Sequence, residues 1–185
     1  MPKVNQRVAI SKYLLKESLL SLLQKKHISK ISISELCQAA EINRTTFYRH
    51  YGTPNDVLQE IILDQIEEFA KCASSSTPHD PKEFAYQLCH SVYEHADKVK
   101  LLMRNDSDID YENIFQALSR HFLGPRTILY RGKAMDEGAL RLMNTFFCAG
   151  IYAIIRQWLT KDSSKTPEEV AELMVSTLNP DFTFQ

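Results

Sequence analysis

Glycine is scarce in this chain, with only 5 among 185 residues, and the four cysteines are isolated from one another. So few glycines argue against a turn-rich all-β fold or an extended phosphate-binding loop. Cys37, Cys72, Cys89 and Cys148 form no C-x-x-C pair, and each lies within a helical pattern. We therefore interpret them as small buried hydrophobic residues in a reducing cytosol, and expect no disulfide, no metal site and no cofactor.

Apolar runs of membrane length are also missing. The first eight residues, MPKVNQRV, lack the apolar core of a signal peptide. Near the C-terminus, the longest stretch without charged side chains is Leu142–Ile155, which would be roughly 21 Å long as a helix. A bilayer requires about 20 residues, so we expect a helix buried by protein, in a cytoplasmic protein without a membrane partner.

Catalytic motifs are absent as well. The sequence contains no G-x-S-x-G, no Walker loop, no H-E-x-x-H and no Cys–His pair at an informative spacing. Its six histidines are scattered along the chain. We therefore do not expect an enzyme.

Charge is unevenly distributed. Residues 1–52 contain nine basic and three acidic side chains, a net charge of +6, although the whole chain carries −1. A basic N-terminal segment on an acidic remainder indicates that only this segment meets a polyanion.

Hydrophobic periodicity predicts helices along most of the chain, and no alternating β-branched run exceeds four residues. We expect an all-α fold of about nine helices, an N-terminal helix-turn-helix domain over 1–52 and a helical bundle over 53–185. The course of 124–135 is not assigned. The expected helices span about 6–25, 32–40, 44–51, 55–72, 81–95, 97–104, 111–123, 136–159 and 166–178.

Capping residues mark several of these helix starts. Ser32 and Glu35 form a predicted capping box, in which each side chain accepts a hydrogen bond from the other residue's backbone amide. Asn43 is a strong N-cap for the short helix that follows. Asp80, Asp136 and Thr166 cap later helices in the same way.

The short helix from Arg44 has a narrow apolar edge and a wide polar one. Phe47 and Tyr51 are spaced i, i+4 and face inward. The polar edge fits the major groove of B-DNA, where base edges display a sequence-specific pattern of donors and acceptors. The expected contacts are a guanine for Arg44, bases or phosphates for Thr45 and Thr46, phosphates for Tyr48, Arg49 and His50, and a phosphate at the amides near Ser32 and Ser34. Asn43 is also expected to be a DNA-binding residue.

Other interpretations of this segment stay open. Short polar helices after a tight turn also occur in α-bundles that do not bind DNA, and His50 could simply cap its helix. The basic segment could instead dock on an acidic partner protein.

The run ISISELCQAAEINRTTFYRHYGTPNDVL resembles the DNA-binding segment of the TetR family of regulators. The resemblance depends on the helix Leu36–Ala40, the turn at Ile42 and above all the signature from Thr46 to Tyr51. The close match covers about Leu15 to Ile62. Residues 146–178 resemble the C-terminal domain of a subgroup common in Gram-positive bacteria.

Two residues depart from the family pattern. Glu41 stands where the family's turn usually has glycine, so the turn must avoid a left-handed conformation there or tolerate it at some cost. Pro54 stands where a lysine often binds phosphate. The absence of this lysine–phosphate contact should weaken DNA binding, although Lys25, Lys26 and Lys30 could compensate.

The resemblance implies a homodimeric transcription factor, usually a repressor, that binds a pseudo-palindromic operator in double-stranded DNA. The alternative is a related protein that activates transcription or works as a protein-interaction module. The apolar stretch Leu142–Ile155 and the last helix are expected at the dimer interface, although a helix buried inside one chain would explain the same pattern.

A small organic effector is expected to bind the second domain. Aromatic rings with polar tips suit such a ligand, although each could instead fill the core. We expect the helix 55–72, interpreted as the one element joined to both domains, to move when the effector binds. The candidate pocket residues are Tyr86, His90, Tyr93, His121, Phe147 and Tyr152.

Overall fold

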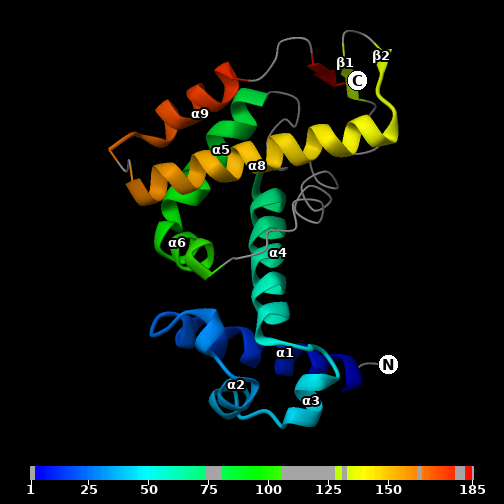
Figure 1. Cartoon of the computed structure of the whole chain (residues 1–185), viewed down its shortest axis with the longest axis vertical. Coiled ribbons are helices and arrows are strands. Elements are labelled where there is room, and N and C mark those ends of the chain that lie inside the picture. The colour runs from blue at the N-terminus through cyan, green and yellow to red at the C-terminus, as the bar shows by residue number, and fades with distance from the viewer. Residues whose placement is uncertain are drawn as a thin grey trace. The chain divides into compact units, whose positions relative to one another are not determined.

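The computed structural model describes residues 3–73, 81–105, 128–130, 133–161, 164–177 and 182–184. Its architecture is helical, as the sequence predicts (Figure 1). The predicted helix 111–123, with His121, and the predicted cap Asp80 lie outside the described residues. The helices are α1 (Lys3–Leu23), the 3₁₀ helix η1 (Ile28–Lys30), α2 (Ile33–Ala39), α3 (Arg44–Tyr48), α4 (Pro54–Ala73), α5 (Pro81–Glu94), α6 (Ala96–Asn105), α8 (Glu137–Lys161) and α9 (Pro167–Ser176).

A small sheet adds the strands β1 (Ile128–Tyr130), β2 (Lys133–Ala134) and β3 (Phe182–Phe184). The strand order is β2-β1-β3, and both pairings are antiparallel. Leu129 is the register partner of both Ala134 and Thr183. Strands of two or three residues are too short to show an alternating pattern, which is why the sequence did not indicate them.

The chain divides into two compact units. Unit 1 comprises Met1–Ile62 together with Leu101–Ser107, and unit 2 comprises the remainder. The boundary expected after residue 52 therefore falls inside unit 1. Because α6 also contributes residues to both units, the expectation that the 55–72 helix alone does so is wrong.

Unit 1 is built around a core that every one of its helices enters. Leu15 and Leu19 of α1, Leu36 of α2, Phe47 of α3 and Leu58 of α4 are all 0% exposed. The last turn of α6 adds Leu102, with Leu101 packed beside it. Full burial of each of these side chains contributes about 1.5–3 kcal/mol.

Asn105 is the one buried polar residue among those the structure describes, at 3% exposure. Its Oδ1 accepts a hydrogen bond from Ile28 N at 2.9 Å, and its Nδ2 donates to Leu101 O at 2.8 Å. Ile28 begins η1, so its amide has no partner within that helix. The end of α6 thus satisfies a buried amide in the connection between α1 and α2.

Replacing Asn105 by leucine should lower the free energy of unfolding by about 1–3 kcal/mol, because the buried Ile28 amide loses its acceptor. Urea unfolding of the whole chain would measure this loss. Arg104→Ala is a suitable control, since the neighbouring Arg104 is exposed and surface changes usually stay within about 0.5 kcal/mol. Equal stability of the two variants would contradict the expectation.

Unit 2 contains α5, α8 and α9, drawn in green, yellow to orange and red in Figure 1. Cys89 of α5 lies 3.9 Å from the sulfur of Met174 in α9. Trp158 of α8 is buried, donates from Nε1 to Lys165 O at 2.9 Å, and stacks on Tyr93 of α5. These contacts join the three helices into one core.

The cysteines whose side chains are described are buried and free, as the sequence indicated: Cys37, Cys89 and Cys148. Burial, with a smaller contribution from the charge of Glu168, raises the pKa of Cys89 to about 12. Burial raises the pKa of Cys148 to about 11. Both thiols are therefore neutral at physiological pH and act as small apolar side chains.

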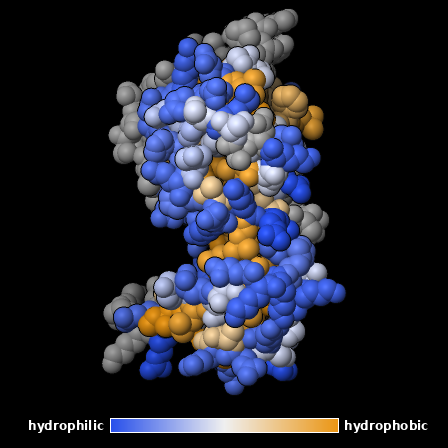
Figure 2. Space-filling model, turned by 90° about the vertical axis from the view of Figure 1, so that its left-hand side faces the viewer, coloured by the Kyte–Doolittle hydropathy of each residue, from blue (hydrophilic) through white to orange (hydrophobic). Residues whose placement is uncertain are grey.

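The surface in Figure 2 is mostly hydrophilic, with separate apolar areas. On α8, Leu142 and Phe146 are 76% and 74% exposed, while Ile155 and Trp158 on another face are buried. Among the described helices, α8 is long and apolar enough to cross a bilayer by length and composition, a test that core helices of soluble proteins also pass. Its N-terminal half therefore presents an uncovered apolar stripe.

Candidate nucleic-acid interface

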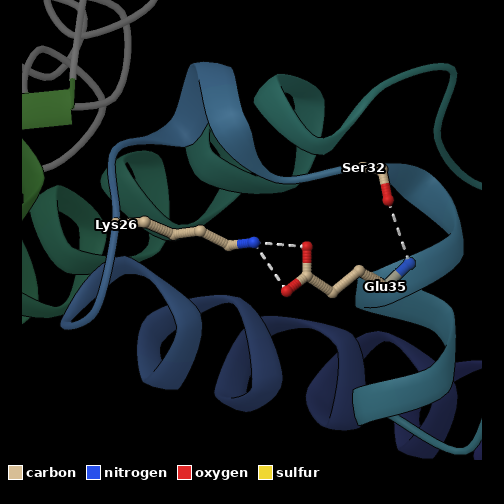
Figure 3. A network of polar contacts seen from close by, with 3 residues as sticks. All are labelled: Lys26, Ser32 and Glu35. Atoms are coloured by element: carbon tan, nitrogen blue, oxygen red, sulfur yellow. Dashed lines mark hydrogen bonds and ion pairs between the residues drawn. The ribbon is translucent and has the colours of Figure 1, made fainter.

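The start of α2 is held by Ser32 and Glu35, drawn with Lys26 in Figure 3. Ser32 Oγ accepts from Glu35 N at 3.2 Å, which confirms the predicted N-cap. The second bond of the predicted capping box, from Ser32 N to the Glu35 carboxylate, is not formed. Both carboxylate oxygens instead lie 2.6 Å from Lys26 Nζ, so a cation from the chain after α1 has taken the place of the amide.

Asn43 positions α3. Its Oδ1 accepts from Thr45 N at 2.8 Å, confirming the predicted N-cap. Phe47 is fully buried and Tyr51 is 5% exposed, so the predicted inner edge is also present. The helix is shorter than predicted, because it ends at Tyr48 and not near Tyr51.

The outer edge of α3 is open to solvent. Arg44, Thr45 and Arg49 are exposed, and Tyr48 is 60% exposed. The remaining predicted DNA contacts divide between exposed Ser32, Ser34 and Asn43 and half-buried Thr46 and His50. Several donors thus gather on one short helix, with the hydrophobic contact made by its opposite edge.

The turn between α2 and α3 adopts the left-handed conformation that the sequence left open. Glu41 has a φ of 54°, and it is the one non-glycine residue with positive φ among those described. This conformation costs roughly 1–2 kcal/mol for a residue with a side chain. The hydrogen bond from Ile42 N to Cys37 O, at 2.9 Å, helps to hold the turn.

A second capping arrangement, which we did not predict, lies at the start of α4. Asp56 accepts from Gly52 N at 2.7 Å and from Thr53 N at 3.0 Å, and Thr53 Oγ1 donates to it at 2.8 Å. Burial raises the pKa of Asp56, but these hydrogen bonds outweigh it and lower the pKa overall. The sequence pattern that could have predicted this arrangement is Thr53, followed directly by Pro54 and, three residues after Thr53, by the acidic Asp56.

Three of the cations in the basic segment are engaged inside unit 1. Lys12 and Lys16 bind Glu60 of α4 at 2.9 and 2.7 Å, and Lys26 binds Glu35. Lys26 would therefore have to leave Glu35 before it could replace a phosphate contact at Pro54. Among the described side chains of the segment, the exposed cations are Arg7, Lys25, Lys30, Arg44 and Arg49.

Glu60 should make unit 1 sensitive to acid. Burial raises its pKa, but hydrogen bonds from Lys16, Lys12 and Tyr51 outweigh this and lower the pKa from 4.5 to about 2. A lowered pKa stabilises the fold above the unfolded value, and this stabilisation is lost as pH falls from about 4.5 to about 2. Between pH 6 and pH 3, the free energy of unfolding measured in urea should fall by about 2 kcal/mol more for the wild type than for Glu60→Gln.

The predicted pocket residues do not share one environment. Tyr86, His90 and Tyr93 lie on α5 and are exposed at the surface. Tyr86 packs near His90, whereas Tyr93 stacks on Trp158. Phe147 and Tyr152 lie on α8 and are half-buried. The α5 residues are thus exposed, and a shared effector pocket remains a prediction.

Comparison with known proteins identifies the family to which this helical fold belongs. A TetR family model described as a transcriptional regulator C-terminal region matches residues 79–180. YxbF of Bacillus subtilis strain 168, an uncharacterized HTH-type transcriptional regulator, is 24% identical over 166 residues, covering 85% of this chain and 42% of YxbF. The chain thus spans less than half of that relative's length.

Two solved structures show the same fold. A TetR transcriptional regulator from Streptococcus agalactiae 2603V is 17% identical, with a TM-score of 0.64 over 93% of this chain and 95% of the other. The TetR family repressor FadR of Thermus thermophilus, solved with lauroyl-CoA, is 17% identical, with a TM-score of 0.54 over 89% and 91% of the two chains. Since the family match covers more than half of the sequence, the chain belongs to the TetR family of transcriptional regulators.

Proposed function

We propose that this chain is a cytoplasmic, non-enzymatic repressor that binds a pseudo-palindromic operator as a homodimer and is released by a small organic effector. The observation that carries the DNA-binding part is the exposed edge of α3. Arg44, Thr45, Tyr48 and Arg49 all face solvent, on a helix whose Phe47 is fully buried. Although the Tyr48 ring packs edge-on against Phe47, packing among the described residues does not account for the exposed donors, which a major groove would satisfy.

The apolar stripe of α8 supports the dimer. Leu142 and Phe146 are exposed, and a Cβ built on Gly150 would meet no atom within 4 Å. A partner helix could therefore approach closely at Gly150 and cover the two large side chains. Leu173 of α9, 49% exposed, would extend the same interface.

A dimer would carry two DNA-binding α3 helices, which has a physical advantage over one. One short helix that touches a few bases and phosphates binds weakly at physiological salt. A dimer places two such helices in successive major grooves, roughly 34–36 Å apart, and then reads two half-sites together.

The proposed release depends on helices that run through both units. Residues of α4 and of α6 belong to unit 1 at one end and to unit 2 at the other. An effector that shifts them would change the geometry of the binding heads. A switch from mostly bound to mostly free requires a roughly 10⁴-fold difference in effector affinity between the two states.

Selection of bound duplexes from random DNA would test the proposal. We expect enriched inverted repeats whose half-sites lie about one helical turn apart, two chains per duplex, and affinity that falls steeply with salt. Binding that is insensitive to both sequence and salt would overturn the DNA-binding function.

A further inference from the structure

We infer that Glu60 of α4 determines how well this protein distinguishes its operator from other DNA. It does so by holding Tyr51, Lys12 and Lys16 in one cluster, called here the Glu60 cluster. The inference rests on the proposed DNA-binding function and adds to it a specificity-determining residue that touches no DNA.

The Glu60 cluster is a partly buried ion network between two helices. Lys12 Nζ lies 2.9 Å from Oε2 and Lys16 Nζ lies 2.7 Å from Oε1, so each carboxylate oxygen has its own ammonium. The Lys16 side chain is only 16% exposed and Glu60 is 29% exposed. At this degree of burial, water and salt screen the pairs less than they screen surface pairs.

Tyr51 connects this network to the reading helix. It follows α3, is 5% exposed, and its ring centroid lies 5.8 Å from that of Phe47. The Lys12 ammonium lies 5.4 Å from the centre of the Tyr51 ring. The Tyr51 hydroxyl also helps to lower the pKa of the Glu60 carboxylate, while the Lys12 ammonium that Glu60 holds provides the geometric link to the Tyr51 ring. The inner edge of α3 is therefore positioned against α1 and α4 partly through Glu60.

The same cluster removes two cations from the set available to phosphates. Sequence-independent affinity for DNA grows with the number of phosphates that a protein neutralises. While Lys12 and Lys16 are paired with Glu60, the exposed cations among the described side chains of residues 1–52 are Arg7, Lys25, Lys30, Arg44 and Arg49. Glu60 thus favours specific binding by aligning α3 and disfavours non-specific binding by occupying two lysines.

The test compares Glu60→Gln with Glu17→Gln in the full-length chain. Glu17 lies exposed on α1, so both changes remove one negative charge from unit 1, but only one of them alters the cluster. Each variant would be titrated with the duplex enriched by selection and with a scrambled duplex of the same length, at several salt concentrations.

For Glu60→Gln we expect about tenfold weaker operator binding, the loss expected from one weakened base contact. Binding to the scrambled duplex should rise about threefold. For this variant, the plot of log affinity against log salt concentration should become steeper by about 0.9 for each lysine that gains a phosphate contact. Glu17→Gln should raise both affinities slightly and in parallel.

Tyr51→Phe keeps every charge and removes one hydroxyl, so it decides the matter if Glu60→Gln folds poorly. It should weaken operator binding about threefold without changing the salt slope, because it disturbs only the positioning of α3. Circular dichroism melts would show that the variants compared are folded.

Parallel affinity changes in Glu60→Gln and Glu17→Gln would overturn the inference, as would equal losses on both duplexes. If Glu60→Gln is unfolded, an unchanged operator affinity in Tyr51→Phe would overturn it. A wild-type chain that binds no duplex in preference to the scrambled one would instead overturn the proposed function itself.

Discussion

Replacing Arg44 by alanine should abolish most of the preference for operator DNA and leave binding to unrelated DNA nearly unchanged. Arg44 is the first residue of α3 and is exposed, so its guanidinium can reach a base edge. A good bidentate contact discriminates by about 1–3 kcal/mol, and a dimer would lose two of them, about 2–6 kcal/mol in total. Titration of the selected and scrambled duplexes would measure the change.

Arg49→Ala is the matched control, since it removes the same side chain from the other end of the helix. Arg49 is the C-cap residue of α3 and is exposed, and we expect it to contact phosphate. Its loss should weaken binding to all sequences alike and reduce the salt slope by about 1 for each head. Arg44 would not be a base-reading residue if its removal weakened both duplexes equally.

Replacing Phe146 by glutamate should convert the proposed dimer into a monomer. The side chain is 74% exposed in one chain, and a partner that covers it could not accommodate an unpaired charge. Operator affinity should then fall about a hundredfold or more, towards the weak range of non-specific binding. Analytical ultracentrifugation would measure the oligomeric state, and DNA titration would measure the affinity.

Thr145→Glu places the same charge on α8 at an exposed polar position about 100° around the helix from Phe146. This control should remain dimeric and keep its operator affinity. If the Phe146→Glu protein were still dimeric, the dimer interface would not include the exposed apolar stripe of α8.

Local interactions account for the parts of the fold that sequence patterns predicted well. Asn43 caps α3, Asp136 accepts from Ala139 N at 2.9 Å, and Thr166 forms the full reciprocal box with Glu169 at the start of α9. Each of these motifs depends on residues two or three apart. Their geometry therefore follows from backbone stereochemistry alone.

Local reasoning failed where a distant group competed for the same atoms. Glu35 was predicted to bond to Ser32 N, but Lys26, nine residues away, takes its carboxylate. The pocket residues of α5 remain a prediction, because aromatic rings with polar tips suit a ligand but helical spacing does not show which face of α5 other helices cover. The structure leaves Tyr86, His90 and Tyr93 on the exposed side.

About twenty consecutive residues suffice to predict α3, its caps, its polar edge and the family signature. The reason is that a short capped helix is specified by its neighbours in the sequence. The partners of Glu60 and Asn105 cannot be predicted in this way. Glu60 meets Lys12 across 48 residues, and Asn105 meets the Ile28 amide across 77. No spacing rule joins such distant positions; they meet because burial of the shared core of unit 1 brings α1, α4 and the end of α6 together.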